Sequence, residues 1–209
     1  EKLGIPLKEQ ERLAGVAVAA SPRAVAEAAD IVCAMMADPA AVASVRDGDD
    51  GIVAGLCPGK GYIDLSTVDA GTSSVSAGLA RGCGALFLEA PVAGSRKPAE
   101  DGTLTIMTAG DRELYDRALP LLGLMGKKIV YLGAVGNASR MKLANNLVMG
   151  GMLAALAEGM ALAGQCGLDL AQLLDVLDSG ALANPMFRLK GPVMAADREF
   201  PPAFPLRHM

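Results

Sequence analysis

Histidine and paired cysteines are nearly absent from this 209-residue sequence, and their scarcity limits its chemistry. The sequence has one histidine, His208, and four cysteines with no Cys-x-x-Cys pair among them. Zinc sites need several nitrogen or sulfur ligands at short spacings, so we expect no bound metal. We interpret the scattered cysteines as free thiols of a reducing compartment; they are Cys33, Cys57, Cys83 and Cys166.

The sequence also lacks any block of basic residues. Its 19 lysines and arginines stand against 23 aspartates and glutamates, which gives a net charge of −4. This balance argues against nucleic acid, and against an anionic membrane, as the main partner. Hydrophobic residues make up 52% of the chain, so we expect a folded protein of one large or two modest domains.

An initiator methionine and a targeting segment are missing as well. The sequence begins at Glu1 with neither a signal peptide nor a transit peptide, and it ends at Met209. We therefore expect it to be truncated at both ends. We expect a cytoplasmic protein, with a plastid or a mitochondrion as the alternative because a transit peptide would stand farther upstream.

The residues that are present change character near residue 135. Up to that point short apolar runs alternate with helical segments, which predicts an α/β fold with a mostly parallel sheet over residues 1–135. No strand pattern follows, so we expect residues 136–209 to form an all-α domain. The expected strands are 16–20, 31–36 (buried), 62–65, 86–89, 104–108 and 129–132; the expected helices are 1–15, 22–29, 40–46, 71–81, 111–124, 169–178 and 183–190, with a polar loop over 90–102.

The helical part begins with one long apolar segment, 133–166, which reads as a single helix. Asn137 is placed to cap it, because a short side-chain acceptor satisfies free N–H groups in the first turn. Lys142 and Asn146 follow four residues apart and therefore share one face. A buried ammonium is costly unless it is paired or used, which makes Lys142 the first candidate for chemistry. The alternative is a Lys142 side chain that reaches water from the helix end.

This segment also has the length of a membrane span. Its interior nevertheless contains Asn145, Glu158 and Gln165, together with several glycines that suit close packing of helices. We therefore favour a buried helix or a subunit interface.

Small and hydroxyl-bearing residues follow three of the predicted strands. In an open parallel sheet, ligands bind beyond the carboxyl ends of the strands. Free backbone donors beside such side chains suit a nucleotide or a small carboxylate, although a Ser-Thr pair at a strand end is also a common helix cap. The three stretches are 36–39 (Met-Ala-Asp-Pro), 64–68 (Asp-Leu-Ser-Thr-Val) and 90–95 (Ala-Pro-Val-Ala-Gly-Ser).

The order of these motifs resembles the β-hydroxyacid dehydrogenases. The resemblance is carried by residues 64–68, 89–95 and 133–142 and by Asn146, and it extends over nearly the whole chain. Three further stretches resemble more specifically the glyoxylate/succinic semialdehyde reductases, best known from plants. They are 94–102 (Gly-Ser-Arg-Lys-Pro-Ala-Glu-Asp-Gly), 184–187 (Asn-Pro-Met-Phe) and 200–208 (Phe-Pro-Pro-Ala-Phe-Pro-Leu-Arg-His).

This resemblance implies a Rossmann-type parallel sheet, without its first βαβ unit, followed by an all-α domain that a long helix begins. It implies that NADPH reduces glyoxylate to glycolate and succinic semialdehyde to 4-hydroxybutyrate, with Lys142 as the general acid. A 3-hydroxyisobutyrate or tartronate semialdehyde dehydrogenase, and a non-catalytic dinucleotide-binding module, are the alternatives. A 6-phosphogluconate dehydrogenase would have Lys-x-x-His-Asn here, whereas Asn145 stands at the histidine position. We also expect a homo-oligomer, either a dimer or a tetramer.

The resemblance further implies a role for individual residues. Lys142 and Asn146 would be catalytic and would also touch the substrate. The expected cofactor contacts are Met36, Ala37, Thr67 and Phe204, and the other expected substrate contacts are Ser66, Ala93, Gly94 and Ser95.

Two departures from the family pattern affect these expectations. The sequence has no Gly-x-Gly-x-x-Gly turn, which in the family holds the pyrophosphate, so NADP rather than NAD rests on the resemblance. Ala93 stands where the family loop usually has serine. The missing hydroxyl would remove one hydrogen bond to the substrate carboxylate, worth roughly 0.5–1.5 kcal/mol.

Overall fold

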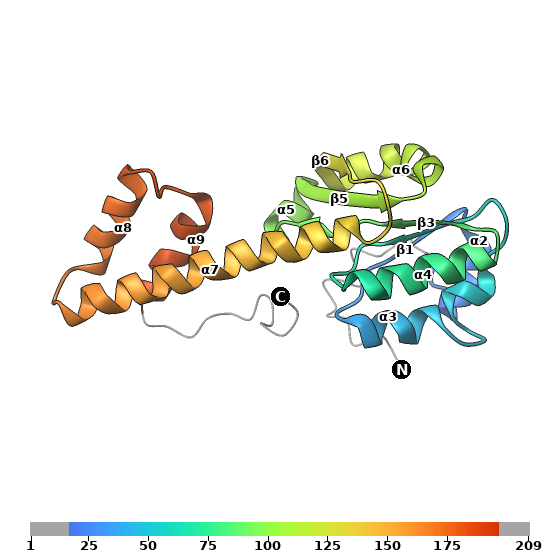
Figure 1. Ribbon diagram of the computed structural model, residues 1–209, viewed down its shortest axis with the longest axis horizontal. Coiled ribbons are helices and arrows are strands. Elements are labelled where there is room, and N and C mark those ends of the chain that lie inside the picture. Colours follow the sequence, from blue (N-terminus) through green and yellow to red (C-terminus); the bar gives the residue numbers. More distant parts are fainter. Residues whose placement is uncertain (1–16, 197–209) are drawn as a thin grey trace.

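The computed structural model describes residues 17–196 and places them around one mixed β-sheet (Figure 1). The pairs β1–β2, β2–β3 and β5–β6 are parallel, whereas β5 runs antiparallel to β3 and to β4. The carboxyl ends of β1, β2 and β3 therefore meet at one edge of the sheet. The strands are β1 (Ile31–Ala34), β2 (Gly61–Asp64), β3 (Leu86–Glu89), β4 (Val92–Ala93), β5 (Leu104–Gly110) and β6 (Gly126–Tyr131).

Helices connect the strands and then continue alone after β6. Several begin at a side chain that accepts a hydrogen bond from a backbone N–H of the first turn, as Ser21, Asp38 and Asp169 do. The helices are α2 (Pro22–Ala28), α3 (Pro39–Arg46), the 3-10 helix η1 (Ile52–Gly55), α4 (Ala70–Gly82), α5 (Arg96–Glu100), α6 (Arg112–Met125), α7 (Asn137–Gln165), α8 (Leu170–Ser179) and α9 (Pro185–Ala195).

Alternate residues of the central strands serve two hydrophobic layers, because successive side chains of a strand point to opposite faces. Tyr62 and Phe87 pack with residues of α2, η1 and α4 on one face. Ile63 and Leu88 pack with residues of α6 on the other. Asp64 and Glu89 stand two residues after Tyr62 and Phe87, so both acids belong to the α4 face.

Helix α7 leaves the sheet and carries α8 and α9 at its far end (Figure 1). Near its start Ala138 packs against Met107 and Ala109 of β5. The change from strands to helices falls between Tyr131 and Asn137, close to the predicted boundary at residue 135. That residues 1–135 and 136–209 are separate domains stays a prediction.

Several expectations about local structure are wrong. Residues 17–20 form no strand and are exposed, since no neighbouring strand pairs with them. The predicted loop 90–102 contains β4 and α5, because Val92 and Ala93 pair with β5. The strand at 31–36 is shorter than expected and only half buried, with Met35 64% exposed.

The predicted cap of the long helix is also wrong. Gly136, not Asn137, is the N-cap residue, and its φ of +93° lies in the left-handed region that favours glycine. Asn137 instead donates a hydrogen bond from its amide to the Leu132 carbonyl oxygen. The expected helix 1–15 and Phe204 lie outside the described residues.

Candidate active site

The carboxyl ends of β1 and β2 are joined by a serine at the predicted cofactor edge. The Oγ atom of Ser66 accepts a hydrogen bond from the Met36 N–H at 2.9 Å, and the Ser66 N–H donates to Oδ1 of Asp64 at 2.9 Å. Two stretches that the sequence analysis assigned to the cofactor and substrate thus lie side by side. Ser66 is 2% exposed, so its hydroxyl serves to hold the Met36 backbone in place.

Thr67 and Ala37 are the more accessible residues of this edge. Thr67 is half-buried, and its hydroxyl forms no hydrogen bond within residues 17–196. Ala37 is exposed directly after the Met36 backbone that Ser66 holds. A free hydroxyl and accessible backbone beyond parallel strands fit a dinucleotide that lies over this edge.

Asp64 is a buried acid directly beneath the same edge, and its position in the sequence predicts no role of its own. It is 1% exposed, and its Oδ2 atom has no hydrogen-bond partner among the described residues. Burial raises the pKa of Asp64, while hydrogen bonds from Ser66 oppose that rise. The neighbouring Arg46 is also buried and forms a 2.7 Å ion pair with Asp47.

The predicted substrate loop follows β3 and crosses β5. Ala93 of β4 pairs with Thr105 of β5, and Gly94 then turns with a φ of +133°, a conformation that L side chains rarely adopt. A Cβ atom on Gly94 would lie 2.7 Å from Cδ2 of Leu104. Ser95 is exposed and its side chain caps no helix, so its hydroxyl is accessible to a ligand.

Lys142 and Asn146 share a face of α7. Lys142 is half-buried, and none of residues 17–196 forms an ion pair or hydrogen bond with it. Burial lowers the pKa of Lys142, because it disfavours the charged ammonium. Asn146 is 3% exposed, and its Oδ1 accepts a 3.4 Å hydrogen bond from the Asn145 amide. An uncompensated ammonium beside a buried amide suits proton donation to a developing oxyanion.

The structure brings part of this site together through packing. Ala93 packs against the group formed by Met107, Ala109 and Ala138, so the substrate loop adjoins the first turn of α7. Lys142 stands four residues after Ala138, on the same side of the helix. A contact between Phe204 and the site lies outside the described residues.

Comparisons with known proteins identify the family of this chain. Residues 6–133 match the NAD binding domain of 6-phosphogluconate dehydrogenase, and residues 136–209 match the NAD-binding domain of NADP-dependent 3-hydroxyisobutyrate dehydrogenase. The chain belongs to the β-hydroxyacid dehydrogenase family. The expectations of a Rossmann-type sheet, a helical part begun by a long helix, and a nicotinamide cofactor for the family are confirmed.

Individual relatives of this chain include two reductases from Arabidopsis thaliana. Glyoxylate/succinic semialdehyde reductase 1, and reductase 2, which is named chloroplastic, are each 47% identical over 93% of this chain. The chain spans 67% of the first and 54% of the second. The solved structure of Psf3 in complex with NADP+ and 2-OPP is 28% identical, with a TM-score of 0.82, and the match covers 90% of this chain and 67% of that one.

One buried acid, which contacts the start of the helix that carries Lys142, was missed by sequence reasoning. Glu89 is 1% exposed, and its carboxylate accepts hydrogen bonds from the first turn of α7. A lone glutamate at a strand end gives no sequence signal for a partner about 50 positions later. Within residues 17–196 no group of three or more His, Cys, Asp or Glu side chains could hold a metal ion.

Proposed function

We propose that the protein containing this chain is an NADPH-dependent reductase of small aldehyde acids, with glyoxylate and succinic semialdehyde as substrates. The observation that carries the proposal is Lys142, a half-buried cation without a described counter-ion, one helical turn from the buried Asn146. The two Arabidopsis relatives, which bear these substrates in their names, support the substrate class. The NADP+ bound in the Psf3 structure supports the cofactor.

The bound cofactor would supply a hydride to the aldehyde carbon. As the carbonyl π bond breaks, negative charge develops on the oxygen. The Lys142 ammonium then donates its proton to that oxygen, which yields the alcohol and leaves a neutral amine that water reprotonates. Asn146 orients the ammonium or the substrate, and the backbone N–H groups of Gly94 and Ser95 hold the substrate carboxylate. The free Thr67 hydroxyl and the Met36–Ala37 backbone would hold the cofactor.

NADPH oxidation by the complete protein with glyoxylate and with succinic semialdehyde tests this function. We expect turnover with both substrates, and a loss of at least about 100-fold in the Lys142→Ala variant with little change in NADPH affinity. An unaffected rate in the variant would contradict the role of Lys142. A parent protein that binds NADPH but reduces neither aldehyde would be a dinucleotide-binding module.

A second candidate is oxidation of 3-hydroxyisobutyrate, or reduction of the corresponding semialdehyde. The match of residues 136–209 to the domain described for NADP-dependent 3-hydroxyisobutyrate dehydrogenase favours it. The same Lys142 and Asn146 would serve this reaction. Comparing kcat/KM for glyoxylate, succinic semialdehyde, tartronate semialdehyde and methylmalonate semialdehyde distinguishes the candidates, since the enzyme discriminates by that ratio.

A further inference from the structure

Glu89 joins the central sheet to the helix that carries Lys142. Its Oε1 atom accepts hydrogen bonds from the Gly136 N–H at 2.6 Å and from the Ala138 N–H at 2.9 Å. Its Oε2 atom accepts a third, from the Ser139 hydroxyl, at 2.6 Å. No described cation pairs with this buried carboxylate, so the start of α7 is its sole described partner.

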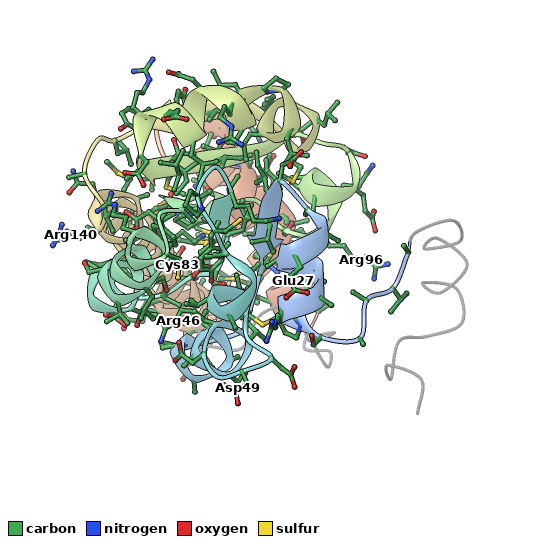
Figure 2. All side chains as sticks on the ribbon, turned by 90° about the vertical axis from the view of Figure 1, so that its right-hand side faces the viewer. Glu27, Arg46, Asp49, Cys83, Arg96 and Arg140 are labelled. Carbon is green, nitrogen blue, oxygen red and sulfur yellow. The ribbon has the colours of Figure 1, made fainter. Side chains whose placement is uncertain are left out.

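The first turn of α7 needs such an acceptor. The first four N–H groups of a helix have no partner within the helix, and the partial positive charge there favours an anion. The N-cap residue Gly136 has no side chain to offer, and the Asn137 amide is directed to Leu132. Arg140 is exposed at the edge of the molecule (Figure 2), where it donates a 3.2 Å hydrogen bond to Asn137, and it forms no described ion pair with Glu89.

The same turn is held by a second buried contact. The hydroxyls of Ser139 and Ser73 lie 2.9 Å apart, which links α7 to α4. Both serines are buried, Ser73 at 0% and Ser139 at 1% exposure. With Ala138 packed on β5, three neighbouring elements thus fix the first turn of α7.

Lys142 stands on the turn that follows this anchor. It lies three residues after Ser139 and four after Ala138, and side chains at these spacings share a helix face. Any shift or rotation of the first turn therefore moves the Lys142 ammonium relative to the strand edge. We infer that Glu89 is a positioning residue, which holds the start of α7 so that Lys142 reaches the substrate oxygen.

This inference rests on the proposed function, and a double-mutant cycle in the complete protein tests it. Glu89→Ala is made with Lys142 present and with Lys142→Ala, and kcat for glyoxylate is expressed per bound NADPH so that unfolded protein does not count. We expect Glu89→Ala to lower kcat by about 10- to 100-fold when Lys142 is present, because misplacement by about 1 Å costs this much. In the Lys142→Ala background we expect a further loss of less than about twofold. Equal losses in both backgrounds would overturn the inference, since a merely structural role affects both alike.

Matched variants distinguish a loss of Lys142 positioning from a general loss of protein stability. Asp169 caps α8 through the Ala171 N–H at 2.7 Å, so Asp169→Ala removes a helix-capping carboxylate far along the chain from Lys142. We expect this control to retain the parent kcat.

Glu89→Gln keeps an acceptor for both N–H groups and should restore most of the turnover lost in Glu89→Ala. No restoration would contradict positioning by these hydrogen bonds. If Glu89→Ala does not fold, Ser139→Ala, which removes one of the three bonds, should show the same non-additivity with Lys142→Ala, and additive losses there would contradict the inference.

A further measurement distinguishes a wrong function from a wrong inference. Amide hydrogen exchange at Gly136 and Ala138 reports on the anchor without any turnover. Faster exchange there in Glu89→Ala, with no change in Asp169→Ala, would support the anchor even if the parent protein reduced neither aldehyde. Unchanged exchange would overturn it even in an active enzyme.

Discussion

Lys142 combines a positive charge with a half-buried position and no described counter-ion. Such a position disfavours the ammonium form and lowers the pKa of Lys142. A general acid benefits, because its proton transfers more readily as its pKa approaches the working pH. Lysine suits this adjustment, since its pKa shifts readily on burial, whereas arginine stays charged.

The pH dependence of turnover should report this lysine. Reduction needs the ammonium form, so kcat should fall as pH rises through the lowered pKa of Lys142, below the range of an ordinary lysine. In Lys142→Arg the guanidinium stays protonated to about pH 12 or higher, so the weaker residual activity should lose this alkaline fall. The measurement is kcat against pH for both proteins with saturating NADPH. An identical alkaline limb in the arginine variant would show that another group titrates.

At the scale of elements, helix ends connect distant parts of the chain. The Lys60 ammonium, at the start of β2, donates to three carbonyl oxygens at the end of α2, those of Ala26, Glu27 and Ala29, at 2.7, 3.0 and 2.6 Å. These carbonyls have no partner within the helix, and the cation also complements the negative end of the helix.

Replacing Lys60 by methionine should therefore destabilise the protein. Methionine keeps the aliphatic stem but leaves the three carbonyls without their charged donor, so we expect a loss of about 1.5–3 kcal/mol in the free energy of unfolding. Urea denaturation measures this loss. Lys127→Met is the matched control, because Lys127 is exposed and no described residue bonds to it. Equal stability of the two variants would refute the bridging role of Lys60.

A change in the turn at Gly94 should alter the conformation of the predicted substrate loop and weaken substrate binding. Alanine there must adopt a φ near +133° and places a Cβ 2.7 Å from Leu104 Cδ2, so Gly94→Ala should cost roughly 1–3 kcal/mol of stability. We also expect KM for the aldehyde acid to rise severalfold while NADPH affinity is unchanged. Gly78→Ala, where the added Cβ meets open space, is the control for kinetics and denaturation. An unchanged KM in Gly94→Ala would remove this loop from the carboxylate site.

Local signals predicted elements well wherever the partner lies nearby in sequence. Ser21, which stands before Pro22, caps α2, and Asp169 caps α8; both caps are local, because a cap depends on residues two or three positions away. The cap of α7 could not be predicted in this way, since Glu89 reaches it only through the fold.

Short strands also cannot be predicted from local sequence when their partner is distant along the chain. The two-residue β4 exists only because β5 pairs with it. At the candidate site, helix spacing and the resemblance predicted Lys142 and Asn146. The bridge from Ser66 to Met36 and the burial of Asp64 became visible only in the folded sheet.

The whole molecule is dominated by the exposed length of α7. By length and composition this helix could cross a membrane. Only 17% of its most apolar window is buried among the described residues, so the expectation of a helix buried within the chain is not met there. Several large apolar side chains face solvent along it, among them Leu147 at 78%, Leu162 at 66% and Val148 at 62% exposure. Extended apolar surface of this kind marks an interaction site.

We propose that the complete protein is a homo-oligomer in which α7 contributes to the interface, since burial of these side chains against a second copy removes apolar area from water. Multi-angle light scattering should give the mass of a dimer or tetramer, and Leu147→Glu should shift it toward the monomer. Leu124 on α6 is also 78% exposed, so Leu124→Glu is a matched control that should leave the mass unchanged. A monomeric parent protein would contradict the proposal. If Leu147→Glu then lowered its stability, while Leu124→Glu did not, the apolar face of α7 would instead be covered within a single chain.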